Sequence, residues 1–279
     1  MNQISIAKRT ERAIQKLTCA LVAAGSVCAA SASVVTYQIN SGGLLSFNVK
    51  IDSTVIDGAL AGGILINQVS SNPTMPANYT TVCTDIEGTL YLGQTYKFDV
   101  PPTPFSGETG LDPTWGAVNT PTYLTGHSTD TANAGQAIQN AAYLFYTYGD
   151  LSSAGIGGTT VQKAALQLAV WEALYDTTAS GQIVTGSGAR FTVTGTGGSD
   201  AAAIQLASTW IATLNGSYNY TGYLLTPASG NSSWWTDGKP PQELFIATVP
   251  EASTVVAGAL LLLPFATSTF KILRRKLKA

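Results

Sequence analysis

Hydrophobic and polar residues alternate in the first hundred residues and again near the end of the chain, and this period of two predicts β-strands. The predicted strand regions are 34–52 (two strands with a turn at 41–43), 58–69, 80–90 and 91–100 (a hairpin), 182–196 (a second hairpin), 217–225 and 243–249. The proline-rich residues 101–131 are expected to form a long surface loop.

Three segments in the middle of the chain have the spacing of apolar residues that is typical of helices. They are residues 132–148, 160–176 and 200–214, the last with Ser199 as its expected N-cap. Segment 160–176 is the clearest, because it contains neither glycine nor proline. Strands, then helices, then strands predict an α+β fold: an antiparallel sheet or barrel-like body with about three packed helices.

Gln167 interrupts the apolar side of segment 160–176, and Glu172 is expected on the opposite, polar side. The neighbours of Gln167 on the apolar side are Ala164, Val170, Trp171 and Leu174. A buried glutamine must satisfy its amide, since an unpaired buried polar group costs about 1–3 kcal/mol. Gln167 therefore needs a specific partner.

Residues 1–32 have the composition of a signal peptide. Basic residues come first, the apolar stretch 17–30 is too short to span a membrane, and the small residues Ala30 and Ala32 mark the expected cleavage site. The folded body is therefore expected at residues 33–248. The export machinery would carry it across the membrane, so it is expected outside the cytoplasm.

Residues 249–279 have the composition of a sorting signal with a single membrane span. Val249, Pro250 and Glu251 precede an apolar stretch at 254–270, which as a helix would be about 26 Å long and could cross a bilayer. A basic cluster follows and is expected to stay cytoplasmic. An ordinary tail anchor is the alternative interpretation.

This C-terminal segment resembles the PEP-CTERM signal, in which a Val-Pro-Glu-Pro sequence precedes one span and a basic end. Ala252 departs from the pattern, because it stands where the family has its second proline. The resemblance implies cleavage by a membrane enzyme called exosortase. The protein would then be an inner-membrane-anchored intermediate before it reaches the cell surface or the extracellular space.

Removal of both terminal signals changes the charge of the protein. The whole chain has a formal net charge of −2, but residues 33–248 retain five basic and fourteen acidic residues, a net charge of −9. A body this acidic is not expected to bind nucleic acid. No phosphate-binding loop, dinucleotide-binding fingerprint or zinc-ligand spacing occurs in the sequence, so no cofactor is expected.

Cys83 is the only cysteine outside the signal peptide, so no internal disulfide is expected in the exported protein. An unpaired thiol is open to oxidation in such a compartment. It could be buried and inert, covalently occupied, or paired with another chain. Alternation along the strand places Cys83 and Asp85 on one face and Val82 on the other, so Cys83 is expected to face the helices.

One arrangement would give both Cys83 and Gln167 a partner. Attack of the cysteine sulfur on the side-chain carbonyl of Gln167, with loss of ammonia, would form an internal thioester.

The sequence Val82-Cys83-Thr84-Asp85 and the helical sequence from Gln167 to Trp171 resemble the two signatures of bacterial thioester domains. Val82 and Thr84 depart from the usual aromatic and aliphatic flanks of the cysteine. The resemblance implies that Cys83 is the nucleophile and Gln167 the acyl donor, supported by Asp85 and Trp171. It also implies covalent adhesion to an amine-bearing surface or an exopolysaccharide.

Other candidate sites carry less information. His127 is the only histidine and lies in the long loop without a Gly-x-Ser-x-Gly sequence, so the protein is not expected to be an enzyme. Asp85 and Glu87 could bind Ca²⁺, but a solvated acidic face is the simpler interpretation. Trp234 and Trp235 could stack on sugars. They support the alternative function, a non-covalent structural or glycan-binding matrix protein in which Cys83 is merely buried.

Overall fold

The fold is taken from a computed structural model, which describes residues 33–51, 54–70, 75–86, 90–101, 105–106, 134–152, 154–175, 191–195, 197–215, 218–228 and 242–247. Several predicted features lie outside these residues: both terminal signals with Ala30, Ala32, Val249, Pro250 and Glu251, most of the loop 101–131 with His127, Glu87, and the pair Trp234 and Trp235. None of the described helices is both long enough and apolar enough to span a membrane.

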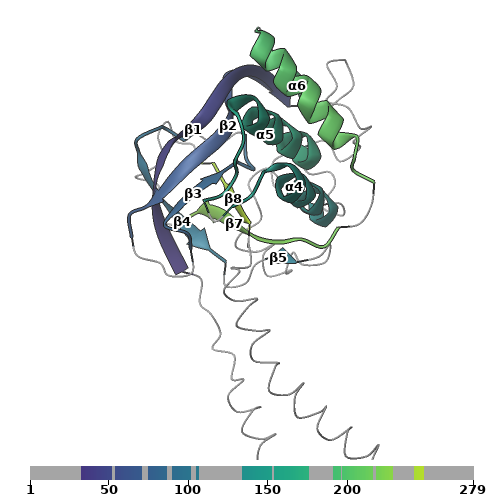
Figure 1. Ribbon diagram of the computed structural model, residues 1–279. Helices are drawn as coiled ribbons and strands as arrows, with labels where there is room; N and C mark the ends of the chain where they lie inside the picture. The colour runs from purple at the N-terminus through teal and green to yellow at the C-terminus, as the bar shows by residue number, and fades with distance from the viewer. Residues whose placement is uncertain are drawn as a thin grey trace, which may run out of the picture. The chain divides into compact units, whose positions relative to one another are not determined.

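The described part is an α+β fold with a nearly closed antiparallel sheet and three helices (Figure 1). The strands are β1 (Ser33–Ile51), β2 (Thr54–Gln68), β3 (Asn78–Thr81), β4 (Thr95–Val100), β5 (Phe105–Ser106), β6 (Phe191–Thr194), β7 (Thr221–Pro227) and β8 (Leu244–Ala247). The helices are α4 (Ala134–Tyr148), α5 (Thr160–Tyr175) and α6 (Gly198–Ile211). The predicted fold class and the three helices are confirmed within a few residues at each end.

The strand order is β3-β2-β1-β4-β7-β5, with β6 paired to β1 and β8 paired to β7. The sheet nearly closes where β8 meets the residues that follow β3. There the amide of Phe245 donates to the carbonyl of Val82 at 3.2 Å, and the amide of Thr84 donates to the carbonyl of Glu243 at 2.9 Å. The hydroxyl of Thr81 also donates to the carbonyl of Phe245. We call residues 81–84 and 243–245 the seam of the sheet.

Residues 34–52 form one long strand rather than the two predicted strands. Side chains alternate between buried and exposed on both sides of the expected turn. β1 pairs with β2 from Tyr37 to Ile51, with register shifts between Phe47 and Val49 and between Ser41 and Leu44. Gly43 and Gly62 have positive φ values there (104° and 145°), and a Cβ on Gly62 would lie 2.2 Å from the Gly43 carbonyl oxygen. Glycine therefore bends the strand where the sequence pattern predicted that it would end.

The hairpin predicted for residues 80–100 is wrong. β3 pairs with β2 and β4 pairs with β1, so the two strands are not neighbours in the sheet. The chain leaves β3 after Thr81 and pairs with β8 instead. The second predicted hairpin lies largely outside the described residues, and its strand β6 pairs with β1.

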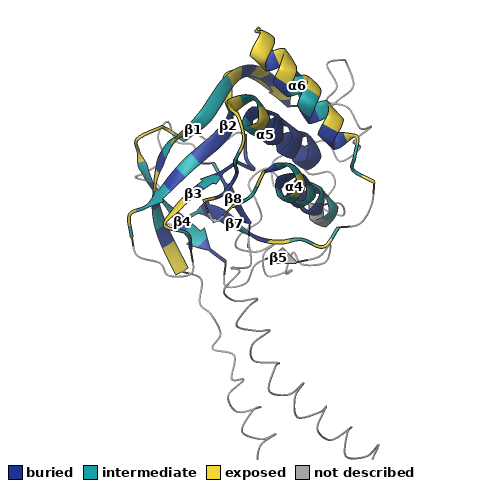
Figure 2. Cartoon of the chain, viewed as in Figure 1, coloured by how far each residue is buried: buried dark blue, intermediate teal, exposed yellow. Residues whose placement is uncertain are grey.

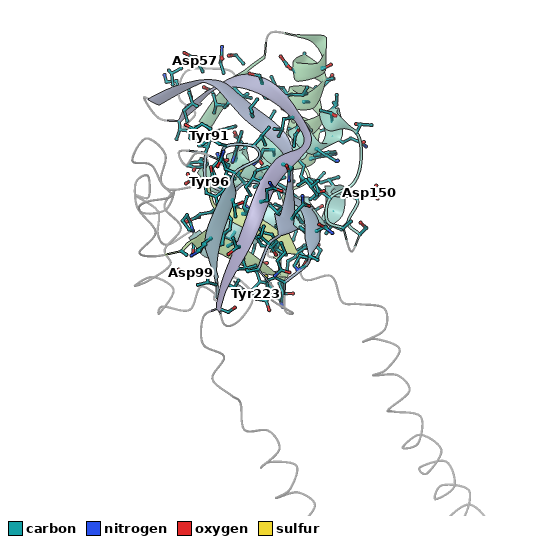
Figure 3. All side chains as sticks on the ribbon, turned by 90° about the vertical axis from the view of Figure 1, so that its left-hand side faces the viewer. Asp57, Tyr91, Tyr96, Asp99, Asp150 and Tyr223 are labelled. Carbon is teal, nitrogen blue, oxygen red and sulfur yellow. The ribbon has the colours of Figure 1, made fainter. Side chains whose placement is uncertain are left out.

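Helix α5 is the central helix, and α4 and α6 flank it over the sheet (Figure 1). Every residue from Ala164 to Tyr175 is buried, as the continuous dark blue of α5 in Figure 2 shows. Glu172 is therefore buried, contrary to the expectation of a polar side, because α5 is packed among α4, α6 and the sheet. Figure 3 views the fold from the sheet side, with Asp57, Asp99 and Asp150 on its outside.

The N-terminus of α6 also differs from the prediction. Gly197, not Ser199, is the N-cap residue, and its amide donates to the carboxylate of Asp200 at 3.0 Å. A carboxylate in the first turn accepts from the free amides of a helix N-terminus and interacts favourably with the helix dipole.

Candidate functional site

Cys83 lies at the seam, directly opposite Leu244 in an antiparallel bridge. Its neighbours Val82 and Thr84 use their main-chain groups to pair with β8. Successive residues of a strand direct their amide and carbonyl groups to alternate sides, so the main-chain groups of Cys83 point away from β8. Those two groups need partners from another element, because Cys83 is only 1% exposed.

The side chain of Gln167, from α5, supplies both partners. The amide of Cys83 donates to Oε1 of Gln167 at 2.8 Å, and Nε2 of Gln167 donates to the carbonyl of Cys83 at 2.6 Å. Gln167 is fully buried. The Gln167 side chain thus takes the place of a neighbouring strand in pairing with the main chain of Cys83. The two residues that the sequence selected, Cys83 and Gln167, are therefore in direct contact.

The position of α5 explains why this glutamine reaches the seam. Small residues (Ala164, Ala165, Ala169 and Ala173) recur along the helix and are fully buried, which lets it pack closely on the sheet. At the start of α5, Nζ of Lys163 donates to the carbonyl of Gly42 at 2.9 Å and ties the helix to the bend of β1. These contacts determine where α5 lies on the sheet and so place Gln167 beside Cys83.

The sulfur of Cys83 contacts a second glutamine. Sγ donates to Oε1 of Gln242 at 3.0 Å. Gln242 precedes β8, two residues before Leu244, and its side chain is therefore a diagonal neighbour of Cys83 across the bridge. Burial, and secondarily the nearby Asp85 carboxylate, raises the pKa of the Cys83 thiol well above its ordinary value, so the thiol is protonated at neutral pH.

Asp85 lies in the interior of the protein rather than on a solvated acidic face. It is 1% exposed, and the hydroxyl of Tyr175 donates to its Oδ1 at 3.3 Å. The same hydroxyl accepts from the amide of Ile86 at 3.1 Å. Tyr175 therefore links the C-terminal end of α5 to the chain that follows the seam, on the same helix that carries Gln167.

Trp171 is one helical turn beyond Gln167 and is 1% exposed. Its ring lies 6.5 Å from that of Phe191 in β6, in a tilted arrangement. Its indole nitrogen has no hydrogen-bond partner in the described part of the chain. Packing between α5 and β6 is the role that these contacts define for Trp171.

A second buried glutamine has the same arrangement without a cysteine. Gln139 in α4 is fully buried, accepts from the amide of Tyr220 at 2.7 Å and donates to the carbonyl of Tyr220 at 3.1 Å. The sequence indicates neither this contact nor the position of Gln242. Position 139 lies within the predicted helix 132–148, but nothing in the sequence identifies Tyr220, the residue before β7, as its partner.

The described residues contain no candidate metal site. Nowhere among them do three or more His, Cys, Asp or Glu side chains lie close enough together to hold a metal ion. Comparison with known proteins gave no match: no protein-family model matches the chain, and neither do any curated proteins or solved structures.

Proposed function

We propose that this chain is an exported protein of the cell surface or extracellular matrix that attaches covalently to a partner through a thioester between Cys83 and Gln167. The observation that carries this proposal is the contact at the seam, where both polar atoms of the Gln167 side chain are held by the residue that bears the thiol. Export, sorting by an exosortase-like enzyme and the single span at 254–270 are inferred from the terminal sequences.

The contact supports the first chemical step by holding the Gln167 amide against the residue that carries the thiol. Sγ attacks Cδ of Gln167, the bond between Cδ and Nε2 breaks, and ammonia leaves with the proton of the thiol. The amide of Cys83 already donates to Oε1, where negative charge develops during the attack. The thiolate is the nucleophilic form of cysteine, and burial keeps this thiol protonated, so the thiol proton has to pass to the leaving nitrogen as the sulfur attacks.

The product is an electrophile stored in a buried site. A primary amine of the partner attacks Cδ, the bond between Cδ and Sγ breaks, and the proton of the amine passes to the sulfur. The result is an amide between residue 167 and the partner, together with a free Cys83 thiol. The class of partner is thus a surface or polymer that carries amines, or more weakly hydroxyl groups.

The contact between Gln139 and Tyr220 favours a second candidate. Here a buried glutamine bridges the amide and carbonyl of Tyr220, the residue before β7, where no cysteine is present. On this alternative, Gln167 only completes the seam, Cys83 is buried and unreacted, and the protein is a non-covalent structural or glycan-binding matrix component.

Amine capture distinguishes the two candidates. The protein is purified from the exporting cell, incubated with methylamine and digested, and the peptides are analysed by tandem mass spectrometry. The proposal predicts an N-methyl amide at residue 167 and a free thiol at Cys83, and no product in Cys83→Ala. Gln139 is the built-in control, because it has the same contacts without a thiol. An unmodified Gln167 in the wild-type protein would reject the covalent function.

A further inference from the structure

The Cys83 sulfur has a neighbour that the thioester reaction does not use. Gln242 places its Oε1 3.0 Å from Sγ, yet its own main chain belongs to the segment that leads into β8, on the far side of the bridge from α5. Gln167 and Gln242 therefore contact Cys83 at different points. Gln167 holds the main chain, and Gln242 holds the sulfur.

Solvent exposure increases from Gln167 through Cys83 to Gln242. Gln167 is fully buried, Cys83 is 1% exposed, and Gln242 is half-buried. Of the three, Gln242 alone is in contact with solvent. On the other side of Cys83 lies α5, in which residues 164–175 are all buried, so we infer that solvent approaches the sulfur from the side of Gln242.

We propose that the Gln242 side chain is a cover over Cys83 that restricts which nucleophiles reach the thioester. This inference rests on the proposed function for its chemistry but not for its geometry, since the cover lies over the sulfur whether or not the bond has formed. With the cover in place, a small amine enters slowly and water is largely excluded. A partner whose surface displaces the side chain of Gln242 gains access to Cδ of Gln167.

The contact between Sγ and Oε1 explains how the cover is held closed before the thioester forms. The thiol donates to Gln242, and a buried, protonated thiol retains that proton at neutral pH. Loss of the proton on thioester formation removes this hydrogen bond, so the cover becomes easier to displace once the electrophile exists. A glutamine is suited to this position, because its amide can rotate between the sulfur and water.

Two variants separate coverage from hydrogen bonding. Gln242→Ala removes the side chain, whereas Gln242→Met keeps its length and bulk without the amide. The matched control is Gln136→Ala, which truncates another half-buried glutamine, one that donates to Asn140 within α4. Thermal unfolding of each variant verifies that the fold is retained.

Mass spectrometry measures the rate of methylamine incorporation at residue 167 in the wild type and in each variant. Where part of the protein has a free thiol, the rate of iodoacetamide alkylation of Cys83 is measured on that part. We expect Gln242→Ala to react at least about tenfold faster than the wild type, a barrier difference of about 1.4 kcal/mol. Gln242→Met and Gln136→Ala should both remain within about twofold of the wild type.

A Gln242→Ala rate within twofold of the wild type for both reagents would overturn the inference. Equal acceleration in the alanine and methionine variants would overturn it as well, because side-chain bulk would then not be what protects the sulfur. Failure of the proposed function has a different signature: no methylamine adduct forms in any variant. The alkylation rates of the free thiol then still decide whether Gln242 covers Cys83.

Discussion

Replacing Gln167 by methionine tests whether the glutamine holds the seam together. Methionine has nearly the same length and volume but cannot bond to the amide and carbonyl of Cys83, which lie 2.8 and 2.6 Å from the Gln167 side-chain atoms. The substitution is made in a Cys83→Ala background, where no thioester can form and the main-chain contacts are kept. Any loss of stability then reports the two hydrogen bonds alone.

The magnitude follows from burial. Cys83 is 1% exposed, so neither of its main-chain groups can turn to water when the glutamine is lost. Each buried group left without a partner costs about 1–3 kcal/mol, and two such groups give a loss of about 2–6 kcal/mol. This is a large part of the stability of a typical domain, which is about 5–15 kcal/mol.

Urea denaturation followed by circular dichroism measures this loss, with an unchanged m-value as the sign that the same structure unfolds. Gln139→Met is the matched control. Tyr220 is only half-buried, so its main-chain groups can be hydrated after the substitution and the expected loss is smaller, about 1–2 kcal/mol. A loss below about 1 kcal/mol for Gln167→Met would refute the reasoning, because the contacts would then not support the seam.

Three further predictions concern the same region. The difference in unfolding free energy between the wild type and Cys83→Ala should not change between about pH 7 and 10, because a thioester has no proton to lose. A free thiol, whose pKa burial raises in the folded state, would instead lower this difference by about 1.4 kcal/mol per pH unit above about pH 8.5, where the unfolded chain ionises. Tyr175→Phe removes the hydroxyl that joins Asp85 and Ile86 and should cost about 1–3 kcal/mol in urea denaturation. Gly155→Ala should lower the thermal midpoint by several degrees, since Gly155 has a φ of 89° and an added Cβ would lie 2.0 Å from the Thr80 carbonyl oxygen; an unchanged midpoint would contradict that packing.

The helices and most strands could be predicted because their signals are local. Helix α5 has strong helix formers and no glycine or proline, and its predicted limits differ from the observed ones by one residue. The buried and exposed positions of β1 alternate as expected on both sides of its bend. Periodicity, however, does not distinguish a glycine that bends a strand from one that ends it, and so the turn at 41–43 was wrongly predicted.

Strand partners could not be predicted, because a period of two shows which side chains share a face and not which strand lies alongside. Residues 82–84 pair with β8, about 160 residues further along the chain. That pairing positions Gln242 next to the sulfur and leaves the main chain of Cys83 for Gln167. The pattern of segment 160–176 predicts a polar side at Glu172 for a related reason, since the elements that pack around α5 cannot be read from the sequence of the helix alone.

Cys83 and Gln167 could be selected from the sequence, because each is a residue that needs a partner in its expected environment. Cys83 was a single cysteine outside the signal peptide, and Gln167 was an amide on an apolar helix face. The structure brings these two residues into contact through the main chain of Cys83. The role of Gln242 needed the register of β8, which only the folded chain provides.

The intact mass of the protein tests the central claim most directly. After export and purification, with both termini assigned by peptide mapping, the wild-type protein should be about 17 Da lighter than its sequence mass, which corresponds to the ammonia lost from Gln167. Cys83→Ala and Gln167→Met should have their full sequence masses, and Gln139→Met should retain the deficit. A wild-type protein at its full sequence mass, with one titratable thiol, would contradict the account and leave Cys83 as a buried residue of the seam.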